Sequence, residues 1–230
     1  MDNETLQQIF SDAGEEYGLV NVKAEFTAFK EMKVRWTRTI CNIDLRVTDY
    51  LKEAPEEIIR GFAEHLMAKI FKEPDIEYPE DFVEWLTSDR FRILNRDTYL
   101  QRSNALPTEY RSTFHDLEGT YKGLISKGLL KEIPDLSLRW TAGRCKNPMG
   151  ASSVLMRSVI VPTYLDTEDL SDKAFEFNLY RLMTNLVIDF GTDPAERRKI
   201  AESMLESYPE SKELSDILEN QVHLASCEVD

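Results

Sequence analysis

The strongest pattern in the chain is a helical repeat of apolar residues over about 172–190. Apolar side chains recur every three or four residues on a wide arc, and the polar residues form one narrow stripe. The segment is therefore predicted to be a buried central helix with a single polar seam. Ser171 or Asp172 can cap its start, and Gly191 can end it. The seam consists of Asn178, Arg181, Asn185 and Asp189.

The N-terminal half of the chain alternates between the periods of helices and strands. We expect its strands to pair in an antiparallel sheet, the simplest arrangement for consecutive half-buried strands. Pro55 and Pro79 each suit the first turn of a helix. The predicted elements are a helix over 4–17, strands around 20–28, 34–36 and 43–47, and helices over 58–71 and 79–86.

The second half repeats this mixture around the central helix. The segment from Arg90 to Arg111 has weak periodicity and many arginines, so we expect a mixture of irregular chain and short pieces of structure there. After the central helix, Asp193, Pro194 and Glu196 form a clear helix start, which Pro209 later interrupts. The remaining predicted elements are a helix over 117–125 closed by Gly128, a strand over 136–140, a loop over 143–150, a strand over 154–161 and a last helix over 214–222.

Composition favours one folded domain. Of the 230 residues, 42% are hydrophobic and 10% aromatic, which is enough to bury a sizeable core. We predict a single α+β domain over 1–230, with a small mixed or antiparallel sheet packed against helices and a loose C-terminal tail. No apolar run is long enough to span a bilayer, and the acidic start differs from a secretory signal. We therefore expect a cytoplasmic protein without a membrane partner.

The charge is unevenly distributed along the chain. The net charge is −14, yet from Arg90 to Arg157 there are 12 Lys and Arg against 6 Asp and Glu, so this window carries +6 and the remainder −20. Gathered on one face, these residues would suit a phosphate backbone or an acidic partner, and otherwise they form a solvated surface. The candidate binding residues are Arg90, Arg92, Arg96, Arg102, Arg139, Arg144 and Lys146.

Few residues point to catalysis or to a metal. The three histidines lack the spacing of paired zinc ligands, and His223 with Cys227 has no evident third or fourth ligand. No phosphate-binding glycine loop and no serine-hydrolase elbow occurs. Cys145 lies in a basic loop that favours its thiolate, but the sequence offers no base to activate it as a nucleophile. We expect no metal and no cofactor.

Several short phrases follow one another along the chain: Val34-Arg35-Trp36-Thr37, Val47-Thr48-Asp49-Tyr50-Leu51, Ala54-Pro55-Glu56, Tyr99-Leu100-Gln101-Arg102, Leu138-Arg139-Trp140-Thr141, the strand 154–161, Leu179-Tyr180 and Tyr208-Pro209. These phrases and the order of the elements resemble the SprT-like zincins, a family of small zinc metallopeptidases, and especially their archaeal relatives. The similarity covers about residues 34–220 and implies a zincin-like fold.

The resemblance lacks the family's chemical motif. The family carries His-Glu-x-x-His directly after a Leu-Tyr pair, where the histidines bind zinc and the glutamate activates the metal-bound water. On this chain the motif places the first ligand at Arg181, the base at Leu182, the second ligand at Asn185 and the third ligand near Arg197. A guanidinium stays protonated, leucine takes no proton and asparagine is a poor zinc ligand. The resemblance thus implies the fold and argues against peptidase activity.

We therefore expect a catalytically inactive, metallopeptidase-like protein that binds or regulates a partner, most simply another protein. The alternatives are a nucleic-acid-associated protein that binds through 90–157, and an enzyme of unrelated chemistry around Cys145, Asp49 or the tyrosines. In the first interpretation, Arg181 replaces the metal's charge and pairs with a carboxylate, Glu202 or Glu206, or else extends from the buried helix to water.

Overall fold

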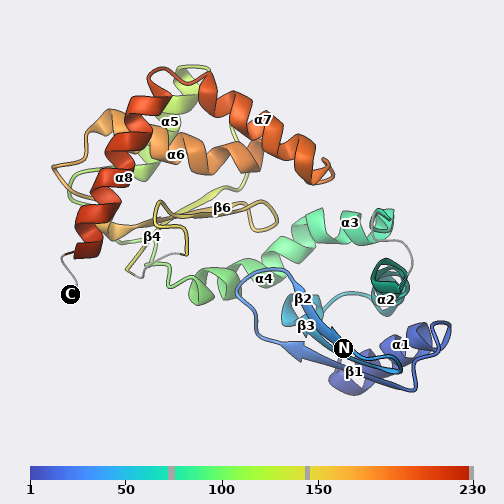
Figure 1. Ribbon diagram of the computed structural model, residues 1–230. Helices are drawn as coiled ribbons and strands as arrows, with labels where there is room; N and C mark the ends of the chain where they lie inside the picture. Colours follow the sequence, from blue (N-terminus) through green and yellow to red (C-terminus); the bar gives the residue numbers. More distant parts are fainter. Residues whose placement is uncertain (72–75, 143–145, 228–230) are drawn as a thin grey trace. The chain divides into compact units, whose positions relative to one another are not determined.

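The computed structural model describes residues 1–71, 76–142 and 146–227 (Figure 1). Over these residues the protein is a mixed α+β structure of eight helices and two three-stranded sheets, which confirms the predicted class. The chain divides into two compact units, Met1–Tyr99 (unit 1) and Leu100–Asp230 (unit 2). The expectation of one domain stays a prediction. Within the described ranges, no helix is both long and apolar enough to cross a membrane.

Unit 1 is a three-stranded sheet with helices packed against one face. Alternate strand residues such as Val22, Leu45 and Val47 are buried beneath the helices, whereas their neighbours are exposed. Its elements are α1 (Asn3–Glu15), β1 (Asn21–Thr27), β2 (Val34–Arg38), β3 (Asn42–Thr48), the short 3₁₀ helix η1 (Asp49–Leu51), α2 (Glu56–Phe71), α3 (Glu80–Thr87) and most of α4 (Asp89–Arg102).

The sheet of unit 1 differs from the all-antiparallel prediction. Its strand order is β1-β3-β2, in which β2 and β3 are antiparallel but β1 and β3 run parallel. The short turn at 39–41 joins β2 and β3 as a hairpin, so β1 meets the other edge of β3 rather than its sequence neighbour. Alternation along each strand predicted the strands but carries no information about this order.

The segment predicted to mix irregular chain with short pieces of structure contains a regular helix, α4. Its start is capped by Ser88, whose Oγ accepts a hydrogen bond from the Phe91 N–H (3.1 Å). Phe91, Asn95 and Tyr99 recur every four residues and are buried, and the Asn95 side chain donates to the Tyr50 carbonyl (3.1 Å). The helix was missed because polar side chains occupy part of its buried face.

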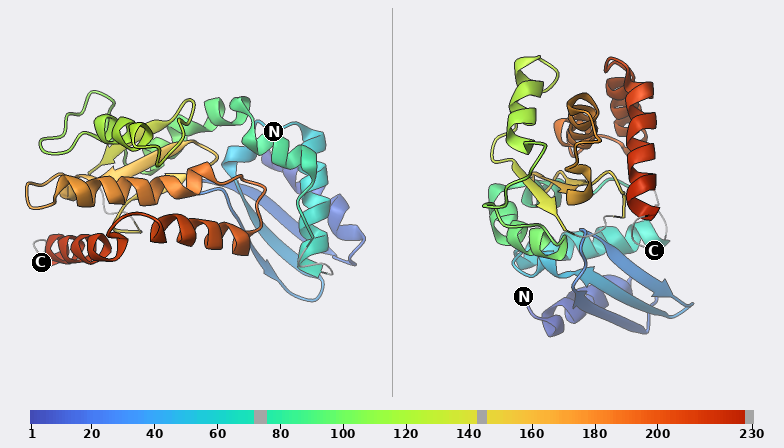
Figure 2. Two further views of the ribbon diagram at one scale, coloured as in Figure 1. Left: turned by 90° about the horizontal axis from the view of Figure 1, so that it is seen from above. Right: turned by 90° about the vertical axis from the view of Figure 1, so that its left-hand side faces the viewer.

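Unit 2 is built around α6, which covers a second three-stranded sheet. In Figure 2, α6 lies between α5 on one side and α7 and α8 on the other. The sheet order is β4-β6-β5, with β4 and β6 parallel and β5 antiparallel to β6. The elements are α5 (Leu117–Ser126), β4 (Ser137–Thr141), β5 (Ala151–Ser153), β6 (Ser158–Pro162), η2 (Thr163–Leu165), α6 (Asp172–Val187), α7 (Pro194–Glu206) and α8 (Ser211–Cys227).

The predicted central helix is confirmed as the core of unit 2. Ser171 caps its start through a hydrogen bond from the Ala174 N–H (3.3 Å), as predicted. Its end differs, because Ile188 is already extended and the helix stops at Val187, before Gly191. Nine of its 16 residues are buried: Ala174, Phe175, Phe177, Asn178, Leu179, Tyr180, Leu182, Met183 and Thr184.

The predicted strand over 154–161 is also shorter than expected. Residues 154–157 form the turn of the β5–β6 hairpin, and only Ser158–Pro162 belongs to β6. Arg157 has a positive φ of 42°, a turn conformation that a strand residue does not adopt. The apolar residues Val154, Leu155 and Met156 produced the β-like pattern, although they pack around a turn.

One glycine allows α6 to approach the sheet closely. Gly150 has a φ of +125°, a conformation that L side chains rarely adopt. A Cβ atom at this position would lie 2.6 Å from the Ile160 carbonyl oxygen and 2.8 Å from Leu182 Cδ1. The loop before β5 is further fixed to α6 by the buried Asn178, whose Nδ2 donates to the Met149 carbonyl (3.0 Å).

We expect Gly150→Ala to lower the free energy of unfolding of unit 2 by about 2 kcal/mol or more, because both the backbone conformation and the close contacts oppose a side chain. Gly61→Ala in α2 is the matched control, since no atom lies within 4 Å of the added Cβ. It should be neutral or stabilising by up to about 1 kcal/mol. Urea unfolding curves measure the stability of both variants, and equal midpoints would show that Gly150 is not needed for the close approach of α6 to the sheet.

Candidate functional site

The positions that the resemblance assigns to a metal site lie on and after α6. Arg181 is half-buried and Asn185, one helical turn later, is exposed. Between them Leu182 is only 5% exposed and belongs to the core of unit 2. The helix therefore points two of the three positions outward, and it uses the position of the general base for packing.

Leu182 packs against Gly150, in the loop before β5. Its Cδ1 atom lies 2.8 Å from the site of a Cβ on Gly150, so the leucine fills the space that the glycine leaves. A carboxylate here would lose its hydration, and burial of a charge without a partner is strongly unfavourable. The packing of α6 against the loop before β5 thus depends on an apolar residue at 182.

The expected ion pair of Arg181 is not formed. Within the described part of the chain, no carboxylate lies within ion-pair distance of its guanidinium, and both Glu202 and Glu206 are exposed. The prediction of that pair is wrong. Arg197, at the third ligand position, lies on α7 and donates from Nη2 to the Asp189 carbonyl, so it closes the α6–α7 connection instead.

Other side chains join α6 to its neighbours. Glu176 on α6 accepts a hydrogen bond from the Tyr208 hydroxyl (2.7 Å), which links α6 to the segment before α8. It also forms an ion pair with Lys127 Nζ (2.5 Å), which links α6 to the end of α5. The Tyr180 hydroxyl donates to the Met204 carbonyl on α7 (3.2 Å). Four polar contacts of this kind hold the helices together without a metal: Tyr208–Glu176, Lys127–Glu176, Tyr180–Met204 and Lys173–Glu210.

The two tyrosines are held in their neutral forms. Burial raises the pKa of Tyr208, and its bond to the Glu176 carboxylate raises it further, because an ionised phenol would lose the donated proton and face a negative charge. Burial alone raises the pKa of Tyr180. The tyrosines thus act as donors, and neither is prepared to serve as a base or nucleophile at neutral pH.

Comparisons with known proteins identify no family for this chain. No protein-family model, no curated protein and no solved structure matches it. The SprT-like resemblance therefore rests on the residues and the order of elements alone.

Metal-binding and nucleophilic groups are not brought together in the described parts of the protein. No three residues among its His, Cys, Asp and Glu side chains are placed to hold an ion. His65 and His115 are buried: the His65 ring is tilted against Tyr78, and the His115 ring stacks on Phe175, with its Nδ1 3.2 Å from the Asp172 carboxylate. The side chain of Cys227 and all of Cys145 lie outside the described residues, so the predictions on them are not tested.

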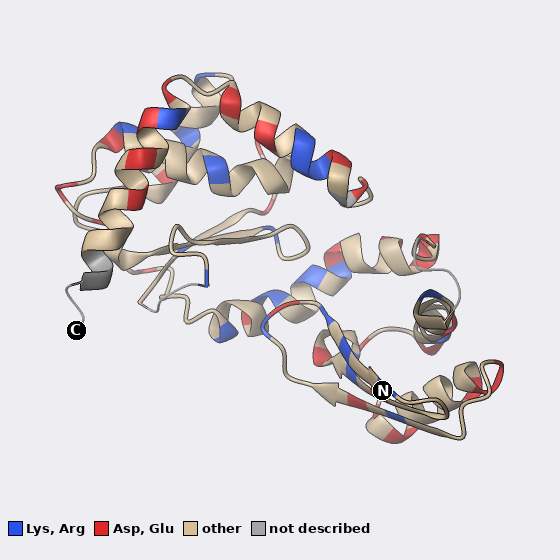
Figure 3. Ribbon diagram, in the orientation of Figure 1, with Lys and Arg blue, Asp and Glu red and all other residues tan. Residues whose placement is uncertain are grey.

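The candidate basic residues differ in their burial and in the contacts that they make. Arg92 is 3% exposed and pairs with Asp89, so it is unavailable for a surface contact. Arg139 donates to the carbonyl of Leu138 (2.9 Å) in β4, whereas Arg90 lies over the Trp85 ring in unit 1. Arg96 and Arg102 are half-buried, Lys146 is exposed, and Arg144 is outside the described residues. Figure 3 shows that basic residues also lie on the strands of unit 1.

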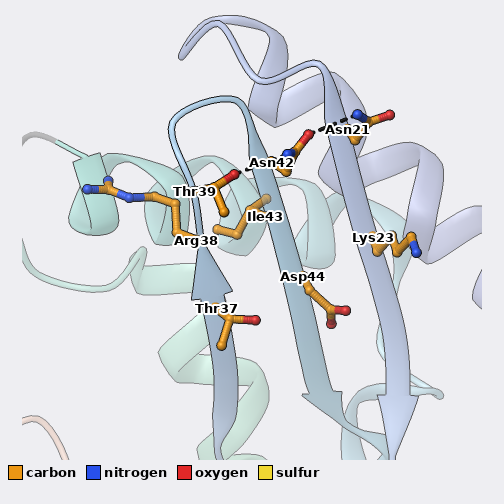
Figure 4. A pocket seen from close by; sticks show the side chains of 8 residues that line it. All are labelled: Asn21, Lys23, Thr37, Arg38, Thr39, Asn42, Ile43 and Asp44. Carbon is orange, nitrogen blue, oxygen red and sulfur yellow. Dashed lines mark hydrogen bonds between the residues drawn. The ribbon is translucent and has the colours of Figure 1, made fainter.

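An open depression of about 510 Å³ lies on the sheet of unit 1 (Figure 4). Asn21 donates to Asn42 (2.8 Å), which in turn donates to Thr39 (3.1 Å), so these polar groups already satisfy one another. Lys23 lies beside Asp44 on the neighbouring strand. The lining provides no pairing of a nucleophile with a base, so it suits surface contact rather than catalysis. Its residues are Asn21, Lys23, Thr37, Arg38, Thr39, Asn42, Ile43 and Asp44.

We expect Tyr208→Phe to destabilise unit 2 by about 1–2 kcal/mol, because it leaves the half-buried Glu176 without its neutral donor. The raised pKa also predicts a pH dependence. Stability should be complete below the unfolded tyrosine pKa of about 10 and should fall above it, since only the unfolded chain then releases the proton.

Urea unfolding between pH 7 and 11 measures this effect. Tyr208→Phe should flatten the loss above pH 10, whereas Tyr110→Phe, at a residue 37% exposed, should leave the curve unchanged. An identical pH dependence in the wild type and in Tyr208→Phe would show that the Tyr208–Glu176 bond contributes nothing.

Proposed function

We propose that this protein is a catalytically inactive relative of the SprT-like zinc metallopeptidases with a zincin-like fold, and that it functions by binding another protein. The observation that carries the proposal is the burial of Leu182, which occupies the position of the general base and is 5% exposed within the core of unit 2. The residue that would have to exchange a proton with metal-bound water is a packing residue.

The element order supports the same assignment. A helix, three strands and then a second helix precede α7, and the candidate ligand positions Arg181 and Asn185 lie one turn apart on the second helix. Arg181 has no lone pair to offer a cation and would repel one. Under this proposal, the positions that bind metal or activate water in the family carry a packing residue and two outward-facing polar residues in this chain.

A metal is also unnecessary for the helices to hold together. The bonds from Tyr208 and Lys127 to Glu176, with the bond from Tyr180 to Met204, link α5, α6, α7 and the start of α8. Zinc sites in proteins often supply such links directly. Here hydrogen bonds and apolar packing supply them, which is what a protein that has lost its metal requires.

The alternatives gain less support. Nucleic-acid binding through 90–157 loses Arg92 to burial and to its ion pair with Asp89. An unrelated enzyme would be indicated by acids with strongly shifted pKa values in a cleft. The acids Asp2 and Asp12 have lowered pKa values, but both are exposed and both are lowered by ordinary hydrogen bonds, so neither indicates such a cleft.

Metal analysis of the purified protein tests the proposal. After incubation with zinc and dialysis, inductively coupled plasma mass spectrometry should find well below one equivalent of zinc. A fluorogenic peptide library should show no cleavage above the background of an α6 variant such as Leu182→Ala. Stoichiometric zinc, or zinc-dependent cleavage that the α6 variant abolishes, would refute the inactive assignment.

A second test restores the missing base. We expect Leu182→Glu to destabilise unit 2 by about 3 kcal/mol or more, because it buries a carboxylate without a partner. Leu182→Met is the matched control of similar volume and should cost less than about 1.5 kcal/mol. If urea unfolding found Leu182→Glu as stable as Leu182→Met, position 182 would be open to water and the central argument would fail.

A further inference from the structure

The outer edge of β2 is an unpaired strand edge. In the β2–β3 hairpin, the Thr48 N–H donates to the Lys33 carbonyl (3.2 Å) and the Thr39 N–H donates to the Asn42 carbonyl (2.9 Å). Lys33 and Thr39 therefore point their backbone groups towards β3. Because such groups alternate along an antiparallel strand, those of Val34, Trp36 and Arg38 point away from the sheet. They form a row of free donors and acceptors at its side.

The opposite edge of the same sheet is covered. Two side chains of α1 bond to the outer backbone groups of β1: Gln7 Oε1 accepts from the Ala24 N–H (2.9 Å), and Asn3 Oδ1 accepts from the Phe26 N–H (2.9 Å). Gln7 also donates to the Val22 carbonyl. The protein thus satisfies one edge internally, and across the described residues no comparable side-chain bond reaches the backbone of β2.

The open edge carries positive charge. Lys33 and Arg35 lie on or beside β2, and no carboxylate within the described ranges forms an ion pair with them. Both lie over the Phe29 ring, at 5.0 Å and 5.5 Å from its centroid. Arg35 also stands opposite Arg46 in the register. Arg38 is already used within unit 1, since its Nη1 donates to the Ile70 carbonyl (3.2 Å) and its guanidinium lies over the Phe71 ring (4.5 Å). Lys33 and Arg35, two cations without acidic partners, favour an acidic ligand.

An apolar contact lies on the same strand. Trp36 is 47% exposed, an unusual exposure for the largest side chain, and it projects on the opposite face of β2 from Arg35. An added strand would therefore meet the basic residues Lys33 and Arg35 on one face of β2 and the indole of Trp36 on the other. A second copy of this chain fits less well, because two paired β2 strands would bring the Lys33 and Arg35 side chains of both copies together on adjoining strands, where like charges repel.

We propose that β2 is a docking edge for an extended acidic protein segment, which adds a strand to the sheet of unit 1. Backbone hydrogen bonds to Val34, Trp36 and Arg38 supply much of the affinity, and alternate side chains supply the selectivity. Acidic residues of the segment face Arg35 and Arg46, and its apolar residues face Trp36. The site lies in a different unit from α6, so the test of this proposal is independent of the test of the inactive assignment.

A blocked peptide of alternating valine and glutamate, seven residues long, tests the site on the full-length protein by ¹H–¹⁵N NMR. Binding should slow hydrogen exchange at the amides of Val34, Trp36 and Arg38 and should leave those of Ala24 and Phe26 unchanged. The double variant Lys33→Glu, Arg35→Glu should weaken binding about tenfold or more. Lys23→Glu on β1, exposed on the same sheet, is the matched control and should change the affinity less than about threefold.

Peptide chemistry separates strand addition from simple charge attraction. The same peptide with N-methyl groups on one set of alternate residues should lose binding, whereas methylation of the other set should be tolerated, since only one set faces β2. Equal binding of both methylated peptides, or of a valine–lysine peptide, would overturn the proposal. So would no binding at all, or sedimentation showing a dimer paired through β2 that the acidic peptide fails to disrupt.

Discussion

The close packing of α6 onto the sheet of unit 2 is the constraint on which the rest of that unit depends. It requires Gly150 in a conformation that other residues avoid, and it requires an apolar side chain at Leu182 to fill the space above the glycine. Once these two residues meet, the helix is fixed with its apolar arc inward. The polar seam then extends from the buried Asn178, through the half-buried Arg181, to the exposed Asn185.

This arrangement explains how the helices of unit 2 are held together. A structural role of a metal is to join elements that lack enough buried surface of their own. In unit 2 the helices α5, α6, α7 and α8 share an extensive apolar core, and the bonds of Tyr208 and Tyr180 link them further. The outward positions 181 and 185 can then vary, whereas the packing requires an apolar residue at 182.

The sequence predicted those elements whose periodicity is strong. The central helix was evident because it is apolar over most of its circumference, and the start of α7 because Asp193 and Pro194 satisfy local rules of helix capping. The helix α4 was missed because Arg92 and Asn95 occupy buried positions, and these depend on partners elsewhere in the chain. The parallel pairing of β1 with β3 was missed because it also depends on residues that are far apart in the chain.

In the candidate sites, some features could be predicted from residue identity and others depend on the fold. The absence of a zinc ligand or a general base at Arg181, Leu182 and Asn185, the positions that the SprT-like resemblance assigns to them, follows from residue identity alone. The links through Glu176 and Tyr208, 32 residues apart, could not be predicted, because their meeting depends on how α7 folds back across α6. The open edge of β2 was also hidden from the sequence, since an edge is defined by the strand order and by the side chains of α1 that cover the other edge.

Native-state hydrogen exchange of α6, measured with zinc and with a chelator, tests the central claim most directly. The account predicts that the amides of residues 176–186 are among the slowest to exchange in unit 2, because they open only when the packing against Gly150 is lost. It also predicts that their rates are the same with zinc and with chelator. Slower exchange along α6 in zinc, or faster exchange in chelator, would contradict it.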